Sequence, residues 1–250
     1  FYLTASQPVI EQVVSETGES QGFISSNTLI IRGRQLNAEM NDEDLQQSNN
    51  SSNQSDLRQK SQVRGNPQVR LGEATVTPQE VNAQEVRLNL ATLPPEKRLL
   101  LHYGVQSLQI VYPLVPKRNT QEPQRIVGSN ILPFVLRPLV VEASVTSAVD
   151  HGDGFYAAEV EVRTDLALLP KQRIFLLLNE LLSNNPEAYV FGVRPFEANS
   201  STVVFPVQDV KQGRYLVRLE IDGAESLLEW DRDLESPTFE QYISPTVTIS

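Results

Sequence analysis

The amino-acid sequence predicts an all-β protein made of two tandem β-sandwich domains, divided near Arg137. Segments with strand-type alternation of apolar and polar residues recur at intervals of roughly 8–15 residues. Gly, Pro, Asn or Asp residues bound each segment, and no amphipathic helical period lies between them. This combination is typical of β-sandwiches, and 250 residues suffice for two domains that each bury a sizeable core.

Two short strands open the first domain, residues 1–137. Pro8 begins an apolar strand, a polar turn follows, and the second strand ends at Gly33. A polar insertion then occupies about residues 37–66. Residues 37–62 carry almost no large apolar side chain, so burial cannot offset the entropy lost on ordering, and we expect a disordered or loosely held loop.

Three Asn-x-Ser triplets lie in this insertion and begin at Asn49, Asn50 and Asn53. They match the acceptor pattern for N-glycosylation in a eukaryotic secretory protein. In a run this rich in Asn and Ser, such triplets also arise by chance.

Four further segments predict the rest of the first domain and the entry to the second: residues 68–76, 85–93, 99–114 and 131–146. Val86, Leu88 and Leu90 alternate with polar residues, which is the period of a half-buried strand. A Pro-Pro pair is expected to end that strand. We expect Gly104 to mark the next turn and Pro138 to lie at the hinge between the domains.

The second domain, residues 138–250, repeats this pattern. In residues 157–165, Ala158, Val160 and Val162 are expected to point inward. Three more strands are predicted at residues 188–193, 201–207 and 214–223. The architecture we expect is therefore two tandem immunoglobulin-like sandwiches.

Two segments of the second domain are especially informative. Residues 172–181 are more uniformly apolar than residues 157–165, as in a strand that is covered on both faces, although their Leu-rich composition also suits a helix. Pro170 before the segment and a Ser-Asn-Asn-Pro stop after it favour the strand. Residues 213–226, GRYLVRLEIDGAES, predict a half-buried strand and then a hairpin turn at Asp222 and Gly223.

The charge is distributed unevenly along the chain. Residues 1–137 carry 13 acidic and 13 basic side chains, whereas residues 138–250 carry 18 acidic and 8 basic ones, a net charge of −10. An acidic surface repels phosphate, which excludes nucleic acid and anionic lipid as favoured partners. Solubility explains such a surface, and a basic protein partner or calcium remains an alternative.

Few residues offer catalytic chemistry. The chain has no cysteine, which excludes disulfides and thiolate metal sites and suits a reducing compartment. His102 lies beside Tyr103 at a predicted strand end, where a structural role is expected. His151 lies in the turn sequence DHGDG, where Asp150 and Asp153 are weak calcium candidates without the spacing of an EF-hand.

A second group of carboxylates lies in residues 229–235, EWDRDLE. Acidic residues occupy every second position there, so an extended backbone would place all of them on one side and make Asp231 and Asp233 weak metal candidates. An acidic surface loop is the alternative. We expect no bound cofactor or metal and no catalytic residues, because P-loop, dinucleotide-binding and nucleophile-elbow motifs are all absent from the sequence. The prediction is that the protein is not an enzyme.

The first domain resembles an IPT/TIG module, an immunoglobulin-like domain. The resemblance rests on Pro8, on the pattern hydrophobic-x-Gly-x-x-Leu at residues 31–36, and on Phe-x-Leu-x-Pro at residues 134–138. It covers about residues 7–138, and the insertion departs from the compact pattern. This fold alone implies no activity.

Both domains together resemble the C-terminal region of the cap, or tail-terminator, family of phage-tail-like contractile injection systems. Four segments carry this resemblance: residues 104–114, 129–138, 172–180 and 213–229. The most specific piece is YLVR-x-x-x-DGAES at residues 215–226. The resemblance implies a structural protein at the distal end of a sheathed tube, preceded by a capping domain that this chain, which begins at Phe1, does not contain.

The same resemblance implies where and with what the protein assembles. We expect assembly in the bacterial cytoplasm, a hexamer of the full-length protein, and contacts with cap, sheath or tube proteins or an envelope component. The particle is either released or held at a membrane, without direct membrane insertion of this chain. The main alternative is a tandem binding module for a surface protein or glycan. An accessory region of a glycosidase or other hydrolase would require a cleft with converging carboxylates, and DNA binding is opposed by the charge.

Overall fold

A computed structural model describes residues 7–37, 62–64, 66–116, 126–181 and 185–250 of the chain. Its strands form antiparallel sheets, and the helical segments in the described part are limited to η2 (Leu90–Thr92) and α2 (Pro95–Arg98). The predicted all-β class is confirmed. None of the helices in these ranges has the length and apolarity needed to cross a membrane.

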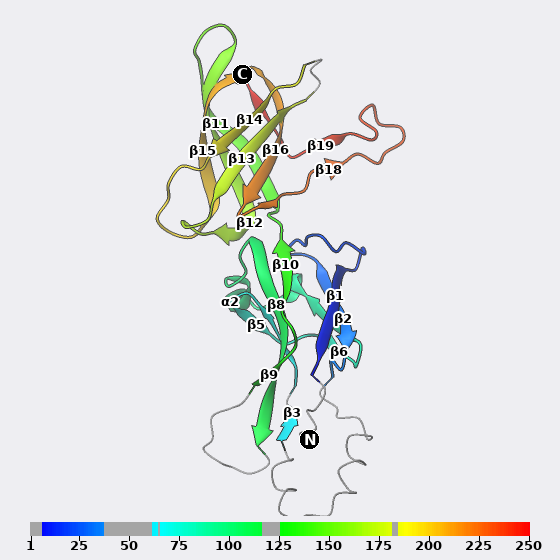
Figure 1. Cartoon of the computed structure of the whole chain (residues 1–250). Helices are drawn as coiled ribbons and strands as arrows, with labels where there is room; N and C mark the ends of the chain where they lie inside the picture. Colours follow the sequence, from blue (N-terminus) through cyan, green and yellow to red (C-terminus); the bar gives the residue numbers. More distant parts are fainter. Residues whose placement is uncertain (1–6, 38–61, 65, 117–125, 182–184) are drawn as a thin grey trace, which may run out of the picture. The chain divides into compact units, whose positions relative to one another are not determined.

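The chain divides into two compact units (Figure 1). Unit 1 comprises Phe1–Leu101 and Ser107–Phe134, and unit 2 comprises His102–Gln106 and Val135–Ser250. The division near residue 134 lies close to the one expected from the sequence. The assignment of residues 102–106 to unit 2 was not expected, because these residues precede much of unit 1 in the chain.

Unit 1 contains two sheets. The first has the order β1-β2-β7-β6, with β1 Val9–Ser15, β2 Thr28–Arg34, β6 Glu80–Val81 and β7 Glu85–Asn89. The second has the order β10-β8-β4-β5, and β3 and β9 also pair with β8. Its strands are β3 Gln62–Arg64, β4 Gln68–Leu71, β5 Ala74–Val76, β8 Gly104–Pro116, β9 Ile126–Gly128 and β10 Leu132–Leu136. Residues 104–106 of β8 and 135–136 of β10 are assigned to unit 2.

The alternation predicted in unit 1 is confirmed where it was clearest. Val86, Leu88 and Leu90 are all fully buried. Residues 68–76, expected as one strand, instead form the β4–β5 hairpin, because Gly72 has a positive φ and turns the chain. The expected strand 99–114 begins only at Gly104, since the residues before it form the turns that follow α2.

Most of the predicted insertion, residues 38–61 and 65, lies outside the described residues, and so do Asn49, Asn50 and Asn53. The loose loop was expected over residues 37–62 and the polar insertion to about residue 66, and the structure corrects the end of both. Residues Gln62–Arg64 form β3 and pair with β8.

Unit 2 contains a three-stranded sheet of order β11-β12-β15 and a five-stranded sheet of order β14-β13-β16-β17, in which β20 also pairs with β16. The strands of the first are β11 Val140–Asp150, β12 Phe155–Leu168 and β15 Ser200–Lys211. Those of the second are β13 Ile174–Glu180, β14 Ala188–Gly192, β16 Gly213–Ile221, β17 Ala224–Glu225 and β20 Thr246–Ile249. A separate pair, β18 (Glu229–Trp230) and β19 (Tyr242–Ser244), carries a loop of its own.

Two strand predictions for unit 2 are confirmed. Ala158, Val160 and Val162 are buried, and residues 172–181 contain strand β13 rather than a helix. The expectation that this strand is covered on both faces is wrong. Its buried face is formed by alternate residues, whereas Phe175 on the other face is 39% exposed.

Candidate functional site

The sequence segment with the most specific family resemblance, residues 215–226, is held by hydrogen bonds along its whole length. The Tyr215 hydroxyl donates to the Lys211 carbonyl at 2.6 Å. Arg218 bridges two neighbouring strands, donating to Glu225 on β17 at 2.8 Å and to Asn179 on β13 at 2.9 Å. These polar side chains therefore connect strands of one sheet.

The end of the segment forms the predicted hairpin. Asp222 and Gly223 both have positive φ angles, 48° and 83°, as a two-residue hairpin turn requires, and Ile221 pairs with Ala224 across it. The buried Ser226 accepts a hydrogen bond from the Leu219 amide at 3.0 Å. The physical requirement behind Asp-Gly-Ala-Glu-Ser is therefore a tight turn followed by the buried residues Ala224 and Ser226.

A second network in unit 2 joins residues that are far apart in the sequence. The Tyr103 hydroxyl donates to Asp165 Oδ1 at 2.6 Å and accepts from the Leu166 amide at 2.8 Å. The Gln172 side chain donates to the Tyr103 carbonyl at 3.2 Å and to Asp222 Oδ2 at 3.1 Å. Burial, reinforced by the Asp165 carboxylate, raises the pKa of Tyr103 above its ordinary value, so the phenol stays neutral.

Sequence reasoning missed this network because local spacing gives no signal for it. Tyr103 and Asp165 are 62 residues apart, and each lies in a segment that was predicted only as a strand. We name residues 102–106 the inserted segment. Gly104 is needed within it, because its φ is +105° and an added Cβ would lie 3.0 Å from the Asp222 Cβ.

The two histidines lie in separate structural settings. His102 is half-buried in the inserted segment, and its carbonyl accepts a hydrogen bond from the Gln106 side chain. His151 lies in the β11–β12 turn, where its amide donates to the Phe155 carbonyl at 2.9 Å. The Asp150 side chain accepts from the Gly152 amide in the same turn, and Asp153 has a positive φ.

The weak metal candidates are not brought together. Within the described residues, no group of three or more His, Asp or Glu side chains could hold a metal ion. Asp150 and Asp153 belong to the turn just described. Asp231 and Asp233 lie in the β18–β19 loop, which is not extended beyond Trp230. The alignment of carboxylates that an extended backbone would give is therefore absent from residues 229–235.

Asp231 instead organises this loop. Its carboxylate accepts from the Thr238 hydroxyl at 2.6 Å and from the Asp233 amide at 2.9 Å. Hydrogen bonds from the side chains of Ser236 and Thr238 and from the Asp233 amide lower the pKa of Asp231. The Asp233 carboxylate in turn accepts from the Glu235 amide at 3.0 Å.

Two exposed aromatic side chains lie at the base of the same loop. The rings of Trp230 and Tyr242 meet edge to face with centroids 4.8 Å apart, and the side chains are 41% and 47% exposed. We name residues 227–244 the acidic lobe. From the sequence it was considered for its carboxylates and for Trp230, and Tyr242 was not singled out.

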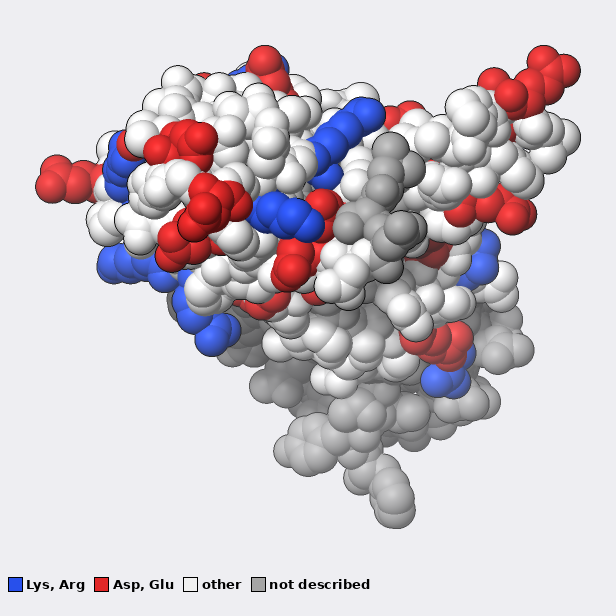
Figure 2. Space-filling model, turned by 90° about the horizontal axis from the view of Figure 1, so that it is seen from above, with Lys and Arg blue, Asp and Glu red and all other residues white. Residues whose placement is uncertain are grey.

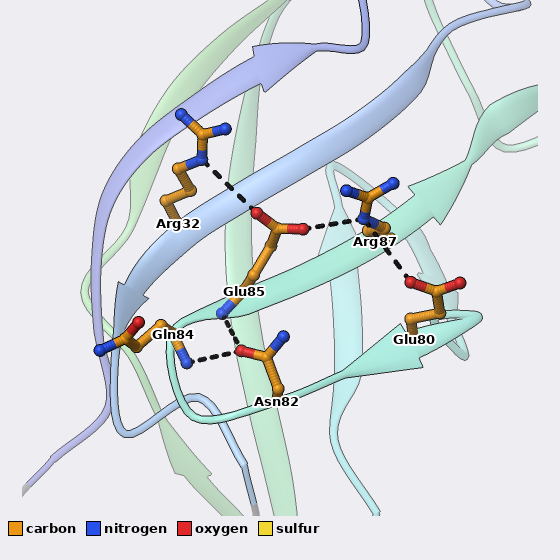
Figure 3. A network of polar contacts seen from close by, with 6 residues as sticks. All are labelled: Arg32, Glu80, Asn82, Gln84, Glu85 and Arg87. Atoms are coloured by element: carbon orange, nitrogen blue, oxygen red, sulfur yellow. Dashed lines mark hydrogen bonds and ion pairs between the residues drawn. The ribbon is translucent and has the colours of Figure 1, made fainter.

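Unit 1 carries a network of charged side chains on its first sheet (Figure 3). Glu85 lies 2.8 Å from the Arg87 Nε and 3.5 Å from the Arg32 Nε, and Glu80 lies 3.6 Å from the Arg87 Nε. The Arg87 hydrogen bond is the main cause that lowers the pKa of Glu85. Asn82 accepts from the Gln84 and Glu85 amides and forms the β6–β7 turn, so this network has a structural role.

Figure 2 shows where charged side chains lie on one face of the molecule. Acidic side chains lie at several places on the face shown, and Lys and Arg side chains lie between some of them. At its right, a projection that corresponds to the acidic lobe of Figure 1 carries acidic side chains at its end.

Comparison with known proteins gives one family match. Residues 138–248 match a family described as a domain of unknown function (DUF8756). This range covers most of unit 2 but omits its inserted segment. A search of curated proteins found no match for the chain.

Proposed function

We propose that this chain is a non-catalytic structural component at the distal cap of a contractile injection system. It is an immunoglobulin-like extension of the tail-terminator protein. The observation that carries the proposal is the structural role of residues 215–226. Their polar side chains connect strands, and their glycine and aspartate form a turn, so the segment with the most specific resemblance serves as scaffold.

Two features of unit 1 support its assignment as an IPT/TIG-like module. Gly33 lies opposite Ile10 in the antiparallel β1–β2 pair, and the strands are so close there that an added Cβ would be 2.0 Å from the Val9 carbonyl oxygen. Leu36 is fully buried, and its carbonyl accepts from the Tyr112 hydroxyl at 2.7 Å. The pattern hydrophobic-x-Gly-x-x-Leu thus has a structural cause. Its glycine allows β1 and β2 to lie close together, and its leucine is buried in the core.

The proposed contacts lie on unit 2, which holds the negative charge. Neighbouring subunits of a hexamer, other cap, sheath or tube proteins, or an envelope component are the partners that the resemblance implies. Assembly takes place in the bacterial cytoplasm. Nucleic acid is disfavoured by the charge of −10 on residues 138–250.

Electron microscopy of particles from the producing cells tests the proposal. An epitope tag after Ser250, detected with gold-labelled antibody, is expected to mark one end of sheathed particles, opposite the baseplate. The untagged strain is the control. Gold along the whole sheath, at the baseplate end, or on no sheathed particle would contradict the proposal.

The alternative, a binding module for a surface protein or glycan, is favoured by one observation, the exposed pair of Trp230 and Tyr242. Aromatic rings stack on sugars and also anchor protein ligands. A glycan array probed with the whole chain tests the sugar arm. Binding that Trp230→Ala abolishes would support it.

A further inference from the structure

The acidic lobe has a backbone that is already ordered without a partner. The Asp231 amide donates to the Gln241 carbonyl at 2.9 Å, and the Glu240 amide donates back to the Asp231 carbonyl at 3.1 Å. Successive turns close the loop between them, with the Phe239 amide bonded to the Ser236 carbonyl. A partner that binds this loop therefore has little conformational entropy to remove.

This ordered loop displays apolar side chains rather than burying them. Trp230 and Tyr242 are about half exposed, and Leu234 near the tip is 80% exposed. Leu227 at the base is 40% exposed. Exposed Trp and Tyr on a preordered loop match the composition of contacts that dominate protein interfaces, and an exposed Leu adds apolar surface that a partner would bury.

Negative charge surrounds these apolar side chains. Residues 227–244 contain five acidic side chains and one basic one, Arg232, a net charge of −4. Asp231 is committed to the loop, whereas Glu235 and Glu240 are exposed. A ligand that covers the aromatic pair must therefore place cations beside it, and a cation is also attracted to the face of a Trp ring.

We propose that the acidic lobe is a docking surface for a peptide segment of another protein that carries Lys or Arg residues around an apolar anchor. One apolar side chain of the segment contacts the Trp230–Tyr242 pair, another contacts Leu234, and the cations lie against Glu235 and Glu240. The inference rests on the lobe alone and holds whether or not the chain belongs to an injection system.

Selection from a library of random twelve-residue peptides displayed on phage tests this directly. The whole chain serves as bait, with the variant Leu234→Ser as a parallel bait. Peptides enriched on the wild-type chain are expected to have more Lys and Arg than Asp and Glu, and to contain Leu, Ile, Phe or Tyr. Absence of enrichment, or enrichment of neutral or acidic peptides, would overturn the proposal.

Fluorescence anisotropy of the enriched peptides then measures the contribution of each part of the surface. Trp230→Ala and Leu234→Ser are each expected to weaken binding more than about tenfold, as expected for residues that dominate an interface. Leu234 is so exposed that its variant keeps the fold, even if Trp230→Ala disturbs the lobe. Leu99→Ser, at an exposed leucine of unit 1, is the matched control and should leave binding unchanged.

A double variant, Glu235→Gln with Glu240→Gln, tests the contribution of charge. A second double variant, Glu19→Gln with Glu197→Gln, is its control. The first should weaken binding and reduce its salt dependence, and the second should do neither. Equal loss in both pairs would show nonspecific attraction and overturn the proposal. Lobe-dependent binding of a glycan, or of a second copy of the chain, in place of basic peptides would overturn it as well.

Discussion

Gly33 illustrates how a single backbone contact restricts the sequence of unit 1. Its neighbour across the sheet is the Val9 carbonyl oxygen, 2.0 Å from the position a Cβ would take. Backbone atoms cannot move aside as a flexible side chain can. Any side chain at this position must therefore push β1 and β2 apart.

Gly33→Ala is expected to destabilise unit 1 by about 1–3 kcal/mol, the usual range when atoms are forced into a packed region. Thermal unfolding followed by circular dichroism measures the loss. Gly192→Ala is the matched control, because no atom lies within 4 Å of its added Cβ and its φ is not positive. Equal melting temperatures for wild type and Gly33→Ala would refute the close approach of β1 and β2 at Gly33.

Asp231 links the order of the acidic lobe to pH. Hydrogen bonds from Ser236, Thr238 and the Asp233 amide lower its pKa in the folded state below the ordinary value of 3.8. Its contribution to stability is therefore present above pH 3.8 and is lost as the pH falls through the lower, folded pKa. Near-ultraviolet circular dichroism of Trp230 and Tyr242 should show the lobe disordering over that acidic range. With Asp231→Asn this step should disappear, and an unchanged step would assign it to another group.

At the scale of secondary-structure elements, strands with clear alternation could be predicted from the sequence, but which strands pair in a sheet could not. The period of two in residues 85–90 and 157–165 reflects one buried face. The Asp-Gly pair at 222–223 predicted a turn because such a pair tolerates the positive φ angles that both residues adopt. The β4–β5 hairpin was missed although the alternation changes phase at Gly72 and Glu73, because the run of residues 68–76 was taken as one strand.

The same limit explains what was missed in the site. The carboxylates of residues 229–235 were visible in the sequence, but the Thr238 hydroxyl that donates to the Asp231 carboxylate lies beyond the segment. The partners of Tyr103 lie 62 residues and more along the chain. Neither arrangement has a local periodicity that a single sequence could reveal.

Tyr103→Phe tests the inserted segment as an element of unit 2. The variant removes the acceptor of the buried Leu166 amide and the donor to the partly buried Asp165, and should destabilise unit 2 by about 1–3 kcal/mol. Denaturant unfolding followed by the fluorescence of Trp230, the sole tryptophan, reports on unit 2. Tyr156→Phe, at a half-buried tyrosine of β12, is the control. If the two variants unfold at the same denaturant concentration as wild type, the network contributes nothing to stability.

At the scale of the whole molecule, the boundary expected from the sequence and the extent of the family match both omit residues 102–106. A fragment of residues 138–250 therefore lacks Tyr103. The Asp165 carboxylate and the Leu166 amide lose their hydrogen bonds to the Tyr103 hydroxyl in this fragment. We expect its Trp230-monitored unfolding midpoint to lie below that of unit 2 in the whole chain. A synthetic peptide of residues 100–108, added in excess, should raise the midpoint, whereas the same peptide with Phe in place of Tyr103 should raise it less. Identical midpoints with and without the preceding chain would show that unit 2 does not need the inserted segment.

The placement of Tyr103 also affects the order of events on the ribosome. Residues 102–106 leave the exit tunnel before Asp165, Gln172 and Asp222 have been synthesised, so the tyrosine has none of these partners until translation has passed them. Recombination that transferred residues 135–250 to another gene would leave the tyrosine behind. The two units are consequently poor candidates for independent exchange during evolution, even though each has its own sheets.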